Sequence, residues 1–74
     1  MSVAAPDRAM PTTPMLYRVE DAMRVLSMGR TLIYEQIRRG RLRSVKQGRT
    51  RLIPLAAIEE YVALLEREAR GGER

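Results

Sequence analysis

The chain has 74 residues and a net charge of +5, with an isoelectric point near 10.7 and neither Cys nor His. This length predicts one small domain, near the lower limit at which a hydrophobic core holds a fold without disulfides or metal. Without Cys and His there is no disulfide, no thiolate or imidazole ligand and no histidine base. We therefore expect no cofactor or metal, and an enzyme is the least expected class. The excess of basic residues favours a polyanionic partner.

The basic residues are unevenly placed along the chain. No Asp or Glu occurs between Gln36 and Ile58, and seven basic residues fall within that window: Arg38, Arg39, Arg41, Arg43, Lys46, Arg49 and Arg51. A solvated surface usually mixes both signs of charge. The window therefore predicts a local anion-binding surface, for DNA first, with RNA or an acidic protein as alternatives. The preference for Arg over Lys suits phosphate and guanine, although a GC-rich genome gives the same bias.

The two ends of the chain differ in composition from its middle. Residues 1–14 are rich in Ala, Pro and Thr and lack an apolar run long enough for a signal peptide or membrane span. We expect a disordered arm over 1–14, an ordered domain over 15–68, and a frayed tail over 69–74. No membrane association and a cytoplasmic location in a bacterial cell or phage-infected host are expected.

Two short helices are predicted next. Leu16, Val19, Ala22, Met23 and Leu26 share one face of a first helix beginning near residue 16. Residues 27–29 interrupt the pattern, as in a helix-turn-helix. A second helix is predicted from residue 30 to 39, with Gly29 at its N-cap and Gly40 closing it in the left-handed conformation.

The second helix divides into two faces. Ile33 and Ile37 should pack on the first helix, and the outward face, which could enter a major groove, should carry Thr31, Tyr34, Glu35 and Arg38. Tyr34 has an alternative role as a half-buried packing residue. Glu35 has one as a partner of Arg38 or Arg39 on the same helix.

A hairpin and a final helix complete the prediction. Strand-forming residues at 42–46 and 50–53 flank a turn at 47–49 that contains glycine. Pro54 should lie in the first turn of the last helix, whose apolar stripe is Leu55, Ile58, Val62 and Leu65, widened by Tyr61. We interpret this stripe as core rather than as a dimer seam, and Leu64 lies off it, available for a weak contact. The predicted fold is mainly α with a small β-hairpin, in the order α-α-β-β-α.

Residues 16–65 resemble the excisionase-like, MerR-like winged helix-turn-helix domains, also called helix-turn-helix 17 and including AlpA-like and BldC-like proteins. The matching pieces are YRVEDAMRVL (17–26), MGRTLIYEQIRRGRL (28–42), VKQGRTRLIP (45–54) and LAAIEEYV (55–62). Gly29 departs from the serine that often caps the recognition helix in this family. Glu35 departs from a basic or neutral residue, and a glutamate can accept a hydrogen bond from cytosine.

The resemblance implies that the second helix reads the major groove of double-stranded DNA and that the wing around Gly48 enters or skirts the minor groove. It places Arg30, Thr31, Tyr34, Glu35 and Arg38 in the major groove, and Lys46, Arg49 and Arg51 at the wing. Arg39 and Arg41 are expected either to hold phosphates or to be merely solvated.

Two functions are expected from this resemblance. One is an excisionase, or recombination directionality factor, that bends attachment-site DNA so that a partner integrase excises a prophage or integrative element, with cooperative self-association on DNA. The other is a small transcriptional regulator at promoters. The short chain favours the first, because MerR-type regulators continue into a coiled coil and an effector domain. A protein-interaction adaptor is disfavoured by the acid-free wing, and no small-molecule ligand is expected.

Overall fold

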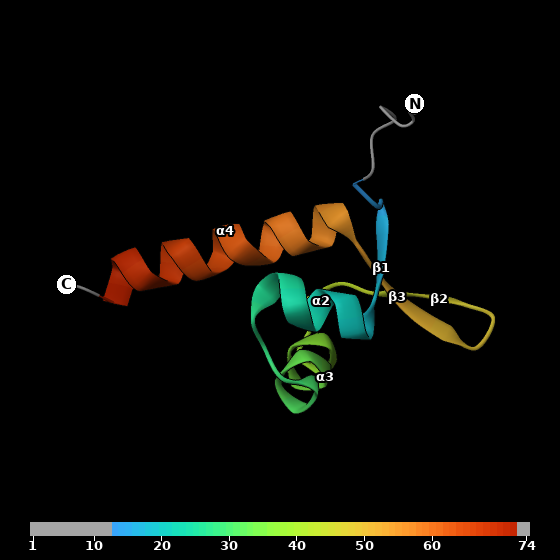
Figure 1. The fold of residues 1–74 in the computed structure, drawn as a ribbon. Helices are drawn as coiled ribbons and strands as arrows, with labels where there is room; N and C mark the ends of the chain where they lie inside the picture. Colours follow the sequence, from blue (N-terminus) through green and yellow to red (C-terminus); the bar gives the residue numbers. More distant parts are fainter. Residues whose placement is uncertain (1–12, 73–74) are drawn as a thin grey trace, which may run out of the picture.

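The computed structural model describes residues 13–72, which form three helices and three short strands (Figure 1). In chain order the elements are β1 (Leu16–Arg18), α2 (Val19–Leu26), α3 (Arg30–Arg38), β2 (Val45–Gln47), β3 (Thr50–Pro54) and α4 (Leu55–Gly72). The β2–β3 hairpin projects from one end of the molecule, and α4 runs past α2 (Figure 1). The predicted winged helix-turn-helix fold is confirmed. The arm expected over 1–14 lies almost wholly outside the described residues.

Helix α2 is short and ends in a left-handed residue. Glu20 and Asp21 occupy its first turn, where the positive end of the helix dipole favours acids. At its C-terminus Ser27 has φ +57°, and the Met28 N–H donates to the Met23 carbonyl at 2.9 Å. This bond spans the helix end as in a Schellman motif, in which the left-handed position is usually glycine. The tight end of α2 sets the turn into α3.

Helix α3 has the ends that the sequence predicts. Gly29 is its N-cap, with extended backbone, and its carbonyl accepts from the Ile33 N–H at 3.0 Å. After the helix, Gly40 has φ +76°, the conformation predicted for it. Ile33 is fully buried and Ile37 packs against the core beside residues of α2, which confirms the predicted inner face.

Strand β1 replaces the predicted start of the first helix. The sequence predicted a helix from Leu16, and this is wrong, because residues 16–18 pair antiparallel with β3, Leu16 opposite Pro54 and Arg18 opposite Leu52. The sheet has the order β1-β3-β2. The pairing joins segments more than thirty residues apart in the sequence, so the spacing of apolar residues within one segment cannot predict it. The apolar positions at 16 and 19 fitted a helix by chance.

The wing is the β2–β3 hairpin. Gln47 pairs with Thr50 across the two-residue loop Gly48–Arg49. Gly48 has φ +63° and Arg49 has no positive φ, as in a type II′ turn. The predicted first strand began too early, since β2 begins at Val45. Leu42 was predicted within that strand, but it lies in the preceding loop with its side chain fully buried in the core.

The last helix presents a different face to the core from the one predicted. Pro54 ends β3 instead of opening the helix. Ala57, Ile58 and Tyr61 are buried and Leu64 packs against them, whereas Val62 and Leu65 are 39% and 38% exposed. Both stripes satisfy three- and four-residue spacing, and packing against the rest of the core selects the one that contains Ala57 and Leu64.

Helix α4 also extends beyond the predicted domain boundary. It continues to Gly72, past residue 68 and into the segment that the sequence predicted to fray. The buried core comes from α2, α3, β3 and α4, together with one loop residue. Its members are Val19, Ala22, Ile33, Leu42, Ile53, Ala57, Ile58 and Tyr61. Among the helices of residues 13–72, none combines the length and the apolar character that crossing a lipid bilayer requires.

Candidate nucleic-acid interface

A groove of about 390 Å³ lies where α3, the wing and the start of α2 meet. Four of its lining residues are arginines and one is acidic. The lining residues are Arg18, Val19, Glu20, Arg30, Tyr34, Arg49, Thr50 and Arg51. Because guanidinium groups donate in a planar fork, such a groove suits phosphate oxygens and the acceptor atoms of base edges. Residues predicted for the major groove and for the wing therefore share one surface.

The outer face of α3 carries the side chains predicted for base contact. Thr31, Tyr34 and Arg38 are exposed. Arg30 occupies the first helical position, and the first turn of α3 contains no acid. A cation at a helix N-terminus is adverse to the helix dipole. Helix stability therefore does not explain Arg30, whereas binding of an anion at this end of the helix does.

Glu35 and Arg39 form an ion pair on α3. The distance between Glu35 Oε2 and an Arg39 guanidinium nitrogen is 2.8 Å, which is the alternative that the sequence left open for Glu35. The carboxylate is thus occupied within the helix. Tyr34 is 37% exposed and lines the groove, so its ring and hydroxyl are accessible from solvent.

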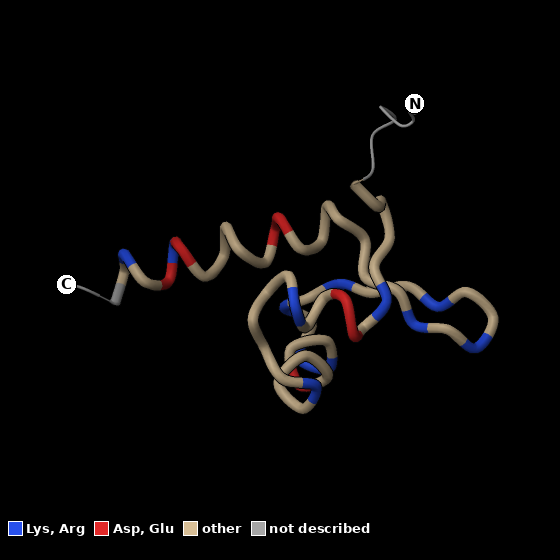
Figure 2. Tube along the Cα trace, in the orientation of Figure 1, with Lys and Arg blue, Asp and Glu red and all other residues tan. Residues whose placement is uncertain are grey.

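The wing places like charges opposite each other. Lys46 and Arg51 are register partners on β2 and β3, and like charges directly opposite in an antiparallel pair are destabilising. An Arg51 guanidinium nitrogen donates to Ser44 Oγ at 2.6 Å. Figure 2 shows basic residues on both strands and at the turn, with no acidic residue along the hairpin. The hairpin therefore carries a positive charge that no acid of its own strands balances.

Two basic residues of the acid-free window, Arg41 and Arg43, bond to acids of α4. Arg41 makes two hydrogen bonds to the Glu68 carboxylate, at 2.7 and 2.8 Å, and its Nε donates to Gln36 Oε1 at 2.7 Å. Arg43 similarly holds Glu60 at 2.9 and 3.0 Å. These bonds lower the pKa of both carboxyls and raise the pKa of both guanidiniums. Arg41, expected at a phosphate or in solvent, instead ties α3 to α4.

By contrast, three predicted contact residues have no acidic partner. Within residues 13–72, no ion pair involves Arg38, Lys46 or Arg49. All three are exposed. Their charges are therefore available to an external anion without first breaking a bond inside the protein.

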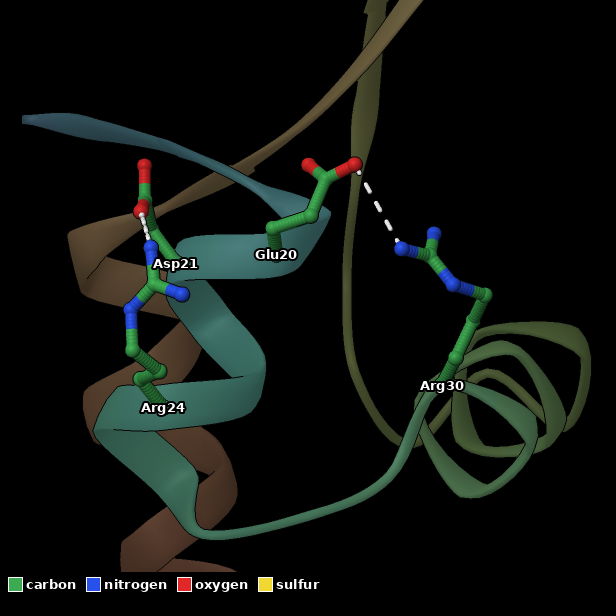
Figure 3. A network of polar contacts seen from close by, with 4 residues as sticks. All are labelled: Glu20, Asp21, Arg24 and Arg30. Carbon is green, nitrogen blue, oxygen red and sulfur yellow. Dashed lines mark hydrogen bonds and ion pairs between the residues drawn. The ribbon is translucent and has the colours of Figure 1, made fainter.

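The sequence missed three polar residues of the groove, Arg18, Glu20 and Thr50, and also Val19, which was predicted only for the core. Arg18 reaches it only because β1 pairs with β3, and nothing local indicates that pairing. No local pattern in the sequence indicates a role for Glu20 in the groove, yet its Oε2 lies 3.4 Å from an Arg30 guanidinium nitrogen (Figure 3). The pKa of the Glu20 carboxyl lies below its usual range. The main cause is a backbone hydrogen bond at Glu20, and the hydrogen bond from Arg30 has a smaller effect.

The chemistry of the site is that of binding. In the part of the chain that the structure describes, no three His, Cys, Asp or Glu side chains gather as metal ligands would. The groove offers guanidinium, hydroxyl and phenol donors around a single carboxylate. This arrangement can hold an anionic chain and distinguish acceptor patterns along it.

Comparison with known proteins identifies the family. The helix-turn-helix domain family matches residues 16–63, which include both α2 and α3 and the whole wing. A protein of Saccharopolyspora erythraea described as a probable excisionase is 43% identical over 51 residues. This match covers 69% of the chain but about half, 52%, of the relative. No solved structure has significant similarity to the chain. With its two helices, its turn and its wing all inside the matched segment, the chain belongs to the excisionase-like helix-turn-helix family.

Proposed function

We propose that this protein is an excisionase, a sequence-specific DNA-binding protein that bends attachment-site DNA and thereby promotes excision by a partner integrase. In this proposal α3 reads base edges in the major groove through Arg30, Thr31, Tyr34 and Arg38. The wing follows the backbone or minor groove beside it through Lys46, Arg49 and Arg51. Arg39 and Glu35 lie at the rim as an ion pair.

The observation that carries DNA binding is the shared groove of α3 and the wing. Arg30 and Tyr34 come from the helix, and Arg49 and Arg51 come from the hairpin. A helix fits the major groove of B-form DNA, and a neighbouring basic hairpin is then placed against the phosphates. The like charges of Lys46 and Arg51, which lie opposite each other in the wing, also support DNA binding. A bound polyanion would offset the cost of their repulsion.

The recombination role is supported by the similarity to a probable excisionase. Because the chain spans about half of that relative, the role is carried over as a proposal. A helix-turn-helix domain of the same shape serves equally well in a transcriptional regulator, since fold does not determine function. An experiment must therefore separate excision from promoter control.

The decisive experiment is deletion of the gene in the genome that carries it. Excision is measured by quantitative amplification of the rejoined attachment junction, in the deletion strain and in strains complemented with wild type or with a Lys46→Ala/Arg49→Ala variant. Wild type should restore excision, and the wing variant should not. As a matched control, Arg67→Ala/Arg70→Ala removes the same charge from exposed positions on α4 and should restore excision.

Unchanged excision in the deletion strain would contradict the excisionase role. If in that strain transcription from a promoter bound by the protein changed instead, the regulator would be the function. Binding to DNA is tested separately by gel retardation, so that a failure of the recombination role does not remove the DNA-binding role.

A further inference from the structure

Glu20 is the acidic residue among the side chains that line the groove. It projects from the first turn of α2 toward Arg30 on α3, and the two side chains approach to 3.4 Å (Figure 3). The neighbouring Asp21 pairs instead with Arg24 on its own helix at 2.7 Å. Consecutive acids of one helical turn thus have separate partners, and only Glu20 faces the groove.

The pairing of Glu20 with Arg30 adds little to the stability of the fold, although a backbone hydrogen bond at Glu20 also engages the carboxylate. The side chains of Glu20 and Arg30 are 58% and 51% exposed, and exposed ion pairs contribute little to stability. Asp21 already supplies an acid to the positive end of α2. In the groove, moreover, the charge of Glu20 opposes binding of phosphate, because it partly cancels the field of the surrounding arginines. An acid that weakens anion binding at the binding surface needs another role.

That role is found in the geometry of Arg30. A guanidinium group recognises guanine through two parallel hydrogen bonds, which require its plane to be held in one orientation. The carboxylate of Glu20 accepts from one terminal nitrogen of Arg30, Nη2, at 3.4 Å, and through the second N–H of this nitrogen the guanidinium keeps one two-bond edge for a base. Fixing a long side chain before binding lowers the entropy lost when it binds.

We propose that Glu20 is a positioning residue for sequence reading, which orients Arg30 for a base edge and at the same time disfavours phosphate in the groove. The inference rests on the DNA-binding part of the proposed function. Repulsion of phosphate acts in every complex with DNA. Orientation of Arg30 acts only in the complex with the preferred site, where Arg30 meets a base. Glu20 thus lowers affinity in general and raises discrimination between sites.

The test compares Glu20→Gln with wild type on two duplexes. One is the duplex that wild type enriches most from a randomised pool, and the other is a scrambled duplex of the same composition. Binding of the scrambled duplex should tighten in Glu20→Gln, and the ratio of the two affinities should fall about two- to tenfold. The matched control Asp21→Asn removes one negative charge from the same turn and should leave this ratio unchanged.

Two further variants separate positioning from charge. Glu20→Asp keeps the charge, but its shorter side chain no longer reaches Arg30. The ratio of preferred-duplex to scrambled-duplex affinity should therefore fall, while the affinity for the scrambled duplex stays at the wild-type value. In an Arg30→Ala background, Glu20→Gln should no longer change the ratio, because the residue that it positions is gone. Thermal melting of each variant checks that the fold is intact, and Glu20→Asp keeps the test decisive if Glu20→Gln melts early.

The inference is overturned if Glu20→Gln and Glu20→Asp retain the wild-type ratio, or if the Glu20→Gln effect persists in full without Arg30. If wild type enriches no sequence from the pool, the sequence-specific function itself fails and this inference fails with it. The two kinds of failure can be distinguished. When only the inference on Glu20 fails, the wild-type protein still enriches a preferred sequence.

Discussion

Arginines that look equivalent in the sequence have different surroundings in the structure. Arg41 and Arg43 are held by carboxylates of α4, whereas Arg38 and Arg49 have no acidic partner among residues 13–72. A guanidinium bonded to a carboxylate has its charge largely compensated and has fewer free N–H donors to offer to DNA. Substitutions at these two kinds of arginine are therefore expected to change different properties, folding in one case and binding in the other.

Replacing Arg38 with Ala should weaken binding of the preferred duplex by about 1 to 3 kcal/mol and relax base choice at one position. The reason is that Arg38 is exposed on the outer face of α3 and its charge is unpaired within the described residues. Titration against preferred and scrambled duplexes measures both effects. The control is Arg24→Ala, which removes an exposed arginine from α2. Wild-type discrimination in Arg38→Ala would show that this residue does not read bases.

Replacing Ser27 with Gly should stabilise the protein by about 0.5 to 1 kcal/mol. Ser27 ends α2 with φ +57°, where any side chain costs energy, although the freer unfolded chain of the Gly variant offsets part of the gain. Urea denaturation gives the difference in unfolding free energy. Ser27→Ala keeps the Cβ atom and should give no such gain. Equal stability of the Gly and Ala variants would mean that the left-handed backbone is not a source of strain.

At the scale of elements, the wing and α4 use basic residues in opposite ways. In the wing Lys46 lies opposite Arg51 and the hairpin itself carries no acidic residue, so we expect an external anion to balance its charge. In α4, by contrast, Glu60 and Glu68 pair with Arg43 and Arg41 in the loop after α3 and neutralise their charges. Leu64 packs against the core, and the Arg41–Glu68 pair continues the contact beyond it, which holds the long helix against the rest of the domain.

The wing should act as an electrostatic clamp that is indifferent to sequence. Replacing Arg49 with Ala should weaken preferred and scrambled duplexes by similar factors and reduce the dependence of log affinity on log salt concentration by about one unit. Affinities measured over a series of salt concentrations give this slope. The matched control is Arg70→Ala, an exposed arginine on α4. An unchanged slope and affinity would assign the hairpin to a different partner.

The tie between α3 and α4 should make stability depend on pH. The hydrogen bond from Arg41 lowers the pKa of Glu68 from its usual 4.5, so the stabilisation is complete above that value and is lost as the pH falls through the lower pKa of the folded state. Glu68→Gln should therefore lower the melting temperature slightly at pH 7, and this effect should diminish as the pH is lowered below 4.5. Glu59→Gln is the control, because Glu59 is exposed and forms no ion pair within residues 13–72. An effect of Glu68→Gln that stayed constant as the pH was lowered would indicate loss of packing rather than of charge.

For the molecule as a whole, the size of the domain limits how one copy can act. A single module of this kind covers about 600 to 1,000 Å² on DNA, which gives modest affinity. We therefore expect useful occupancy of a site to need several copies on adjacent repeats. Neighbouring copies on bent DNA share the cost of the bend, which is about 1 to 6 kcal/mol for a short site.

The protein should therefore be monomeric in solution and should bind attachment-site DNA in successive, cooperative steps. Sedimentation gives the state of the free protein, gel retardation gives the steps, and a circular-permutation gel gives the bend. A preformed dimer on a single palindrome, with no bend, would contradict this arrangement and would favour a promoter-binding regulator.

Local features of the sequence were sufficient for α3, the wing turn and the basic surface. Gly29 and Gly40 delimit the recognition helix, and Gly48 marks the turn, because each has a conformational property that is expressed locally. The outward positions of Thr31 and Arg38 follow from helical geometry alone once the helix is placed.

Tertiary structure alone decided which segments meet. Residues 16–18 are a strand because β3 offers its free edge, and Arg18 enters the groove for that reason. Leu64 rather than Leu65 packs against the core. Two stripes of α4 have the same spacing, and only the packing of α4 against the complete core determines which stripe is buried. The carboxylates of Glu20 and Glu68 find arginines on other elements. A sequence records which residues can pair over three or four positions, whereas the partners of a free strand edge or a long charged side chain are set by the complete fold.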